Sequence, residues 1–179
     1  MMIRFLRNIL AYLSKTQGII ILIILYISIN FIMYRFSPVE FSKIDQSKAE
    51  TAILDIKFSY SQDFVKTTLN SYGDEGRAKY LKFSLMDMLY PLVYSLLLAS
   101  LLFKLFYNSR YNPYLFALFA GLFDYIENAF LIHFNLSFPD INNWEVIISS
   151  FATSLKWSFI IISFIALISG VVKIIKNRN

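Results

Sequence analysis

The residues best able to do chemistry lie in the stretch LFDYIENAFL, residues 122–131, within a long apolar run. Asp124, Glu127 and Asn128 occupy positions i, i+3 and i+4, a spacing that places them on one face of a helix. A charged side chain at the centre of a membrane helix costs about 2.5–3.5 kcal/mol, so such residues usually face the bundle interior and serve function. Burial disfavours the charged form of a carboxyl group, which suits a general acid or base. Asp124 and Glu127 are therefore the catalytic candidates if the protein is an enzyme.

Lys156 brings the opposite charge into the last apolar run of the chain. Ser149, Thr153 and Lys156 repeat at helical spacing and share one face. Counting about 1.5 Å per residue from the outer ends of the expected spans places Asp124 about 15 Å deep and Lys156 about 13 Å deep. The matching depths predict an Asp124–Lys156 ion pair, with Glu127 lying nearer the outer surface.

The polar faces together predict a cavity in the outer half of a helical bundle. A third face, on the second apolar run, holds Asp87 one turn before Pro91. The predicted ligand-binding residues are Arg77, Tyr80, Asp87, Tyr90, Tyr94, Asn128, Lys156 and Trp157. Polar side chains also join membrane helices through hydrogen bonds worth about 0.6 kcal/mol on average, so a purely structural role for the ion pair stays open.

Four apolar runs are long enough to span a membrane, and the polar faces described above lie on three of them. The chain is 57% hydrophobic, above the roughly 45–50% of soluble domains, and a span needs about 20 apolar residues. We expect an all-α, four-helix transmembrane bundle with up-down-up-down topology, in which Pro91 kinks the second helix near Asp87. The expected parts are an amphipathic cytoplasmic segment at 1–15, spans at 16–35, 81–106, 113–138 and 146–172, a cytoplasmic loop at 107–112, an outer loop at 139–145 and a cytoplasmic tail at 173–179.

The connection at 36–80 is too long for a simple turn, and we expect it to form a small helical cap on the outer side. Ser61 is expected to cap the start of a helix and Gly73 to end it in a left-handed conformation. Asp74 is then placed to cap the helix that follows.

Lys and Arg gather at the ends of apolar runs that would share one side of the membrane, and no acidic residue accompanies them. These residues are Arg4, Arg7, Lys15, Lys104, Arg110, Lys173, Lys176 and Arg178. Such a bias marks the cytoplasmic side, so both termini are expected there. The net charge of +5 therefore does not predict binding of nucleic acid, which needs a clustered basic surface on a folded module.

The scarcity of two residue types excludes several kinds of chemistry. The chain has no cysteine and a single histidine, His133, which rules out thiolate nucleophiles and a histidine-rich metal site within one chain. We expect neither a metal nor a cofactor. Composition rich in Ile, Lys and Asn suits a low-GC bacterium, and hence a bacterial inner membrane.

Three segments, YGDEGRAKYLKFSLMDMLYPLVY, LFDYIENAFL and TSLKWSF, resemble a family of small bacterial four-span membrane proteins. The pattern of that family is GxEGRxxY entering a helix with an Asp and a Pro, then DYxEN, then LKW, and the resemblance covers about residues 55–175. It implies a four-span fold but no reaction. The architecture is also similar to the emopamil-binding (EXPERA) group, compact helical bundles with acids and aromatics in an intramembrane pocket, although no motif of that group aligns.

Three functions remain open from the sequence. The first is binding of a lipid-like or other amphipathic small molecule in the cavity. The second is an intramembrane enzyme that modifies a lipid or isoprenoid, and the third is a structural subunit or assembly factor whose polar residues contact a membrane protein partner or a second copy of the chain.

Overall fold

The computed structural model describes residues 2–36, 54, 57–107 and 109–176, and these residues contain helices and no strand. The helices are α1 (Met2–Leu13), α2 (Thr16–Phe36), α3 (Gln62–Asp87), α4 (Tyr90–Leu105), α5 (Tyr114–Ser137) and α6 (Asn143–Lys176). The predicted all-α class is confirmed.

Four helical stretches of the described chain are long and apolar enough to cross a membrane. They are Thr16–Tyr34, Gln62–Leu105, Tyr114–Ser137 and Asn143–Lys176, and each overlaps one of the four apolar runs expected to span. Their mean hydropathy over the most apolar windows lies between 1.6 and 2.5. These lengths and compositions are those of an integral, multi-pass membrane protein.

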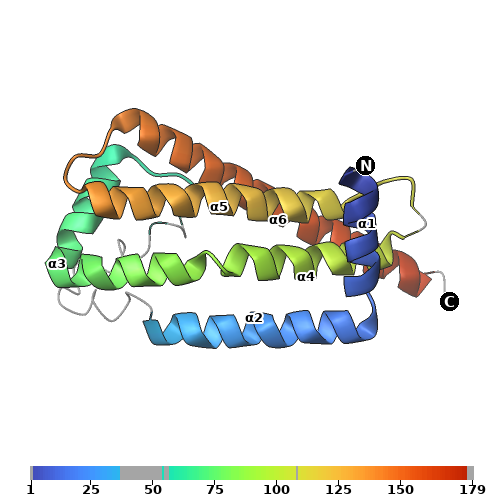
Figure 1. Ribbon diagram of the computed structural model, residues 1–179. Coiled ribbons are helices and arrows are strands. Elements are labelled where there is room, and N and C mark those ends of the chain that lie inside the picture. The colour runs from blue at the N-terminus through green and yellow to red at the C-terminus, as the bar shows by residue number, and fades with distance from the viewer. Residues whose placement is uncertain (1, 37–53, 55–56, 108, 177–179) are drawn as a thin grey trace.

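The long helices lie alongside one another. Two clusters of buried apolar side chains, one toward each end of the bundle, pack the helices together. Figure 1 shows α4 between α2 and α5, with α6 crossing α5 at an angle and α1 lying across one end. α5 packs most extensively against α6 and α4, whereas α2 packs mainly against α4. At the α1 end, Leu10 is buried among Leu98, Leu102 and Ala117. At the α3 end, a second cluster joins α3, α5 and α6.

The α4–α5 contact is close because small residues meet there. A Cβ atom built on Gly121 would lie 2.7 Å from the Cβ of Ser95 and 3.1 Å from the Pro91 carbonyl oxygen. Ser95 and Gly121 are both buried, so the backbones of the two helices approach each other as in other small-residue membrane interfaces.

The second predicted span is broken where its sequence contains proline. α3 ends at Asp87 and α4 begins at Tyr90, because Pro91 lacks the N–H that a continuous helix would need. The predicted kink near Asp87 is therefore confirmed.

The region expected to form the cap contains the first half of α3. Ser61 caps this helix by accepting a hydrogen bond from Phe64 N, as predicted. Two helical parts of α3 meet at a kink at Gly73, so the first part ends there as predicted. Gly73 has the expected positive φ of 63°, but its ψ of −178° is extended and not that of a left-handed helix. The second part of α3 runs without interruption through residue 80 to Asp87, so the end of the expected cap and the start of the expected span belong to one helix. Residues 37–53 and 55–56 of the predicted cap lie outside the described residues.

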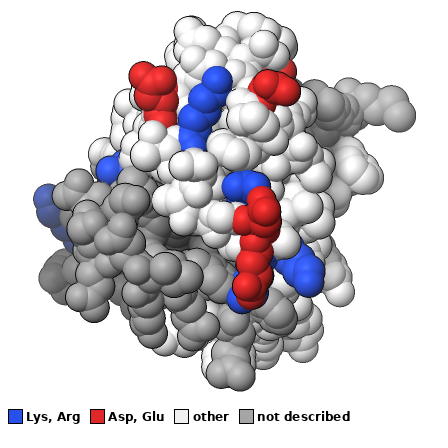
Figure 2. All heavy atoms as spheres, turned by 90° about the vertical axis from the view of Figure 1, so that its left-hand side faces the viewer, with Lys and Arg blue, Asp and Glu red and all other residues white. Residues whose placement is uncertain are grey.

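The two ends of the molecule differ in charge. Figure 2 looks onto the α3 end, where basic and acidic residues are interspersed. Ion pairs there join Asp74 to Arg77 and Glu75 to Lys79, the latter at 2.7 Å. At the α1 end the described charged residues, including Lys104, are all basic.

Candidate functional site

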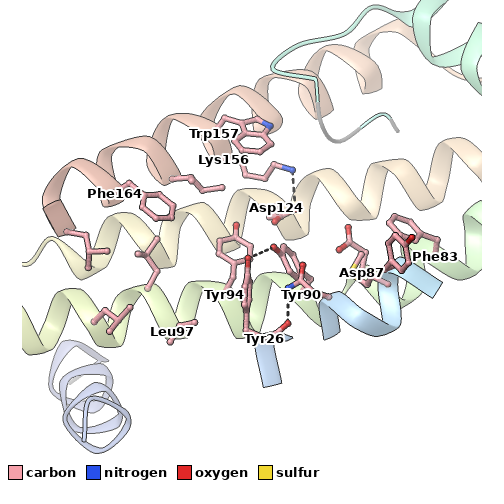
Figure 3. A pocket seen from close by; sticks show the side chains of 17 residues that line it. Tyr26, Phe83, Asp87, Tyr90, Tyr94, Leu97, Asp124, Lys156, Trp157 and Phe164 are labelled. Carbon is pink, nitrogen blue, oxygen red and sulfur yellow. Dashed lines mark hydrogen bonds and ion pairs between the residues drawn. The ribbon is translucent and has the colours of Figure 1, made fainter. Parts of the chain in front are cut away.

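A pocket of about 690 Å³ lies between α2, α4 and α6 and reaches Asp124 on α5. Its polar lining includes Asp87, Tyr90, Tyr94 and Lys156, beside Asp124. Figure 3 shows Asp87 and Asp124 toward one end of this lining and Leu97 and Phe164 toward the other. The polar end lies at the break between two helices. Asp87 is the last residue of α3, and Tyr90 and Pro91 are the first residues of α4.

Lys156 stands between two buried carboxylates of α5. Its Nζ lies 2.6 Å from Glu127 Oε2 and 3.5 Å from Asp124 Oδ1, and the three side chains are almost fully buried. Thr153 Oγ1 donates to Glu127 Oε1 at 2.6 Å. The predicted Asp124–Lys156 pair is present, and Figure 3 shows the two side chains pointing toward each other.

The contact between Lys156 and Glu127 was not predicted, because only Asp124 was expected to pair with the lysine. The i, i+3 spacing on α5 presents both carboxylates to the same face of α6. The long lysine side chain then reaches back from its own backbone toward Glu127, which makes the shorter of the two contacts.

Tyr60, just before α3, completes this polar cluster and was not predicted. Its hydroxyl lies 2.6 Å from Ser149 Oγ, and its backbone N–H donates to Ser150 Oγ at 2.9 Å. Burial raises the pKa of Tyr60 above its ordinary value, and the nearby Glu127 carboxylate raises it further, so the phenol stays protonated at neutral pH. Tyr60 lies in a mixed-charge segment without helical periodicity, so no sequence pattern pointed to it.

Aromatic rings form one wall of the pocket. The ring centroids of Tyr26 and Tyr90 are 5.7 Å apart, and those of Tyr90 and Tyr94 are 5.3 Å apart. Tyr90 OH donates to Tyr26 OH at 3.1 Å, which ties α4 to α2. Tyr26 and Asn30, which both line the pocket, were missed. Their i, i+4 spacing in an otherwise apolar run was the available signal.

The predicted site residues fall into three places. Lining the pocket are Asp87, Tyr90, Tyr94, Asp124, Lys156 and Trp157. Glu127 and Asn128 are buried beside it, with 0% and 1% of their surface exposed, and are not part of its lining. Of the two acid–base candidates, only Asp124 is therefore placed to contact a molecule in the pocket.

The remaining two predicted residues, Arg77 and Tyr80, lie on α3 between Gly73 and Asp87 and do not line the pocket. Arg77 forms an ion pair with Asp74, and its guanidinium lies 4.6 Å from the centroid of the Phe138 ring. Tyr80 is buried against the rings of Tyr72 and Phe83. Both side chains therefore help to pack the α3 end.

In the described part of the chain, no group of three or more His, Cys, Asp or Glu side chains is arranged to hold a metal ion. Comparison of the chain with protein-family models, curated proteins and solved structures finds no match.

Proposed function

We propose that the protein binds a lipid-like or other amphipathic small molecule in the pocket between α2, α4 and α6, within the bilayer. One observation carries the proposal: the pocket joins ionisable side chains, Asp87, Asp124 and Lys156, to a long apolar wall that includes Leu101. Its volume of about 690 Å³ falls in the range of roughly 300–1,000 Å³ that is usual for small-molecule sites. Ionisable side chains are costly inside a membrane, and binding of a polar ligand group is a function that would account for their presence.

We propose that the α1 end of the bundle faces the cytoplasm and the α3 end the outside, with four spans alternating in direction. The all-basic charge of the α1 end supports this orientation. The run of colour along successive long helices in Figure 1 supports the alternating directions. Both termini then lie in the cytoplasm, and α3 begins in an outer cap. Composition and the resemblance over residues 55–175 favour a bacterial inner membrane.

Native mass spectrometry of the purified protein tests ligand binding. The wild type is compared with Leu101→Trp, which fills the apolar part of the pocket, and with Leu92→Trp as the matched control. Leu92 lies on the same helix, does not line the pocket and is 48% exposed, so tryptophan there adds the same bulk to the lipid-facing side.

We expect the wild type and Leu92→Trp to carry a defined mass of a few hundred daltons that Leu101→Trp lacks. Bare protein in all three samples would contradict ligand binding. A co-purifying protein in place of a small mass would instead support the role of a subunit or assembly factor.

A further inference from the structure

The lining of the pocket changes from polar to apolar along both α4 and α6. On α6 the change runs from Lys156 to Phe164 and Leu167, and on α4 it runs from Tyr94 to Leu101. The polar and apolar parts are therefore separated along the length of the bundle. A molecule that fills the pocket needs a polar group at one end and hydrocarbon at the other.

Packed side chains close the apolar end of the pocket. Gly170, three positions beyond Leu167, lies against the end of α4, and a Cβ atom built on it would be 2.9 Å from Phe106 Cε2 and 3.2 Å from Leu105 Cδ1. Leu98 lines the pocket and also belongs to the apolar cluster at the α1 end, against which Leu167 packs. Because α4 and α6 meet just past Leu167, a hydrocarbon chain in the pocket has a fixed stopping point.

The length of the apolar part can be counted along α6. Lys156 and Leu167 are 11 positions apart, which corresponds to about 16 Å of helix. An extended hydrocarbon chain advances about 1.3 Å per carbon, because its C–C bonds are about 1.5 Å long and zigzag. A chain of about twelve carbons therefore reaches from the level of Lys156 to the closed end.

The volume of the pocket limits the ligand to one such chain. About 690 Å³ lies within the range of roughly 300–1,000 Å³ that is usual for small-molecule sites, and a two-chain phospholipid needs more room than this. The wall that such a chain would contact includes Leu97, Leu101 and Ile160, whose side chains carry no polar atom. The pocket thus has room for a headgroup and a single alkyl chain.

We propose that the pocket selects its ligand by chain length and takes an amphiphile with one unbranched hydrocarbon chain of about twelve carbons. The headgroup lies at the level of Lys156, and the methyl end of the chain stops at Leu167. This proposal rests on the proposed ligand-binding function and specifies the number and length of the hydrocarbon chains of the ligand. It makes no demand on the charge of the headgroup.

The test compares straight-chain primary alcohols of eight to eighteen carbons, which share one uncharged headgroup. The full-length protein is purified in a steroid-based detergent, which has no alkyl chain to compete, and is incubated with an equimolar mixture of the alcohols. After repurification, the retained alcohols are extracted and measured by gas chromatography. The detergent content of each sample corrects for alcohol dissolved in the micelle.

Three variants test the closed end of the pocket. Leu167→Ala shortens the side chain at the stopping point, and Leu167→Phe enlarges it. Ile168→Ala is the matched control, because Ile168 is the next residue of α6, does not line the pocket and is 62% exposed.

We expect the wild type and Ile168→Ala to retain most alcohol at about twelve carbons and about tenfold less at sixteen, because a longer chain must displace packed side chains. In Leu167→Ala the maximum should move to chains about two carbons longer, since the smaller side chain leaves space. In Leu167→Phe it should move to shorter chains, which keeps the test decisive if Leu167→Ala does not fold.

Two results would overturn selection by chain length while leaving ligand binding intact. One is retention that keeps rising up to eighteen carbons, and the other is a maximum that stays in place in the folded Leu167 variants. Retention by the wild type of no alcohol beyond the share of the micelle would instead contradict ligand binding itself.

Discussion

At the scale of single residues, Lys156 both lines the pocket and forms the buried ion pairs between α6 and α5. Its ammonium group is buried between Asp124 and Glu127, and Glu127 is also held by Thr153. A buried ion pair adds little stability over apolar residues of similar volume, but removing one partner leaves an uncompensated charge. The lysine is thus needed for folding whatever the pocket binds.

Replacement of Lys156 by Met should lower the free energy of unfolding by about 3–5 kcal/mol, because two carboxylates then lack their ammonium partner. Thermal unfolding in detergent measures the effect. Lys173→Met is the control, since Lys173 is an exposed lysine on the same helix. The double variant Lys156→Met/Glu127→Gln should recover part of the loss, and equal melting of wild type and Lys156→Met would refute this account.

The charged residues of the site could be predicted from the sequence, whereas several neutral ones could not. Asp124 and Lys156 are conspicuous because their cost in a membrane demands a partner, and their depths could be counted. Tyr60 has no distinguishing local sequence, and Tyr26 is marked only by Asn30 four residues later. Only the fold brings them to the buried cluster and to the pocket.

At the scale of helices, the α4–α5 contact depends on Gly121. Its missing side chain leaves room for Ser95 and for the carbonyl of Pro91 on the facing helix. The contact also sets the distance between Asp124, one turn further along α5, and the tyrosines of α4. Spacing of these two helices therefore determines the width of the polar end of the pocket.

The substitution Gly121→Val should destabilise the protein by about 1–3 kcal/mol, because overpacking forces α4 and α5 apart. Unfolding in detergent is again the measurement, and Ala129→Val is the control on an exposed position of the same helix. Similar melting of the two variants would show that the close contact is not needed.

The four apolar, span-length helical stretches were predictable because length and apolar composition are read directly from the chain. The break at Pro91 was also predictable, because a proline lacks the N–H group that a continuous helix needs. The extended ψ of Gly73 was not predictable, since the sequence indicates that a glycine can take a positive φ but does not fix its second backbone angle.

At the scale of the whole molecule, the proposed orientation rests on the contrast between an all-basic α1 end and a mixed α3 end. The absence of cysteine from the chain makes this orientation directly testable. Single cysteines can be placed at two exposed positions, Asn70 on α3 and Tyr111 in the connection before α5.

A membrane-impermeant maleimide applied to cells whose inner membrane is intact should label Asn70→Cys and leave Tyr111→Cys unlabelled. Disruption of the membrane should make both reactive, which controls for accessibility. Labelling of Tyr111→Cys alone in intact cells would reverse the proposed orientation.

The burial of Lys156 against α5 has a consequence for biosynthesis. α2 is free of charge from Thr16 to Tyr34 and can partition into the bilayer as soon as the ribosome releases it. α5 carries two carboxylates within its apolar sequence, and the lysine that pairs with them belongs to α6, which is made after α5. We therefore expect α5 and α6 to enter the bilayer together, as a helical hairpin.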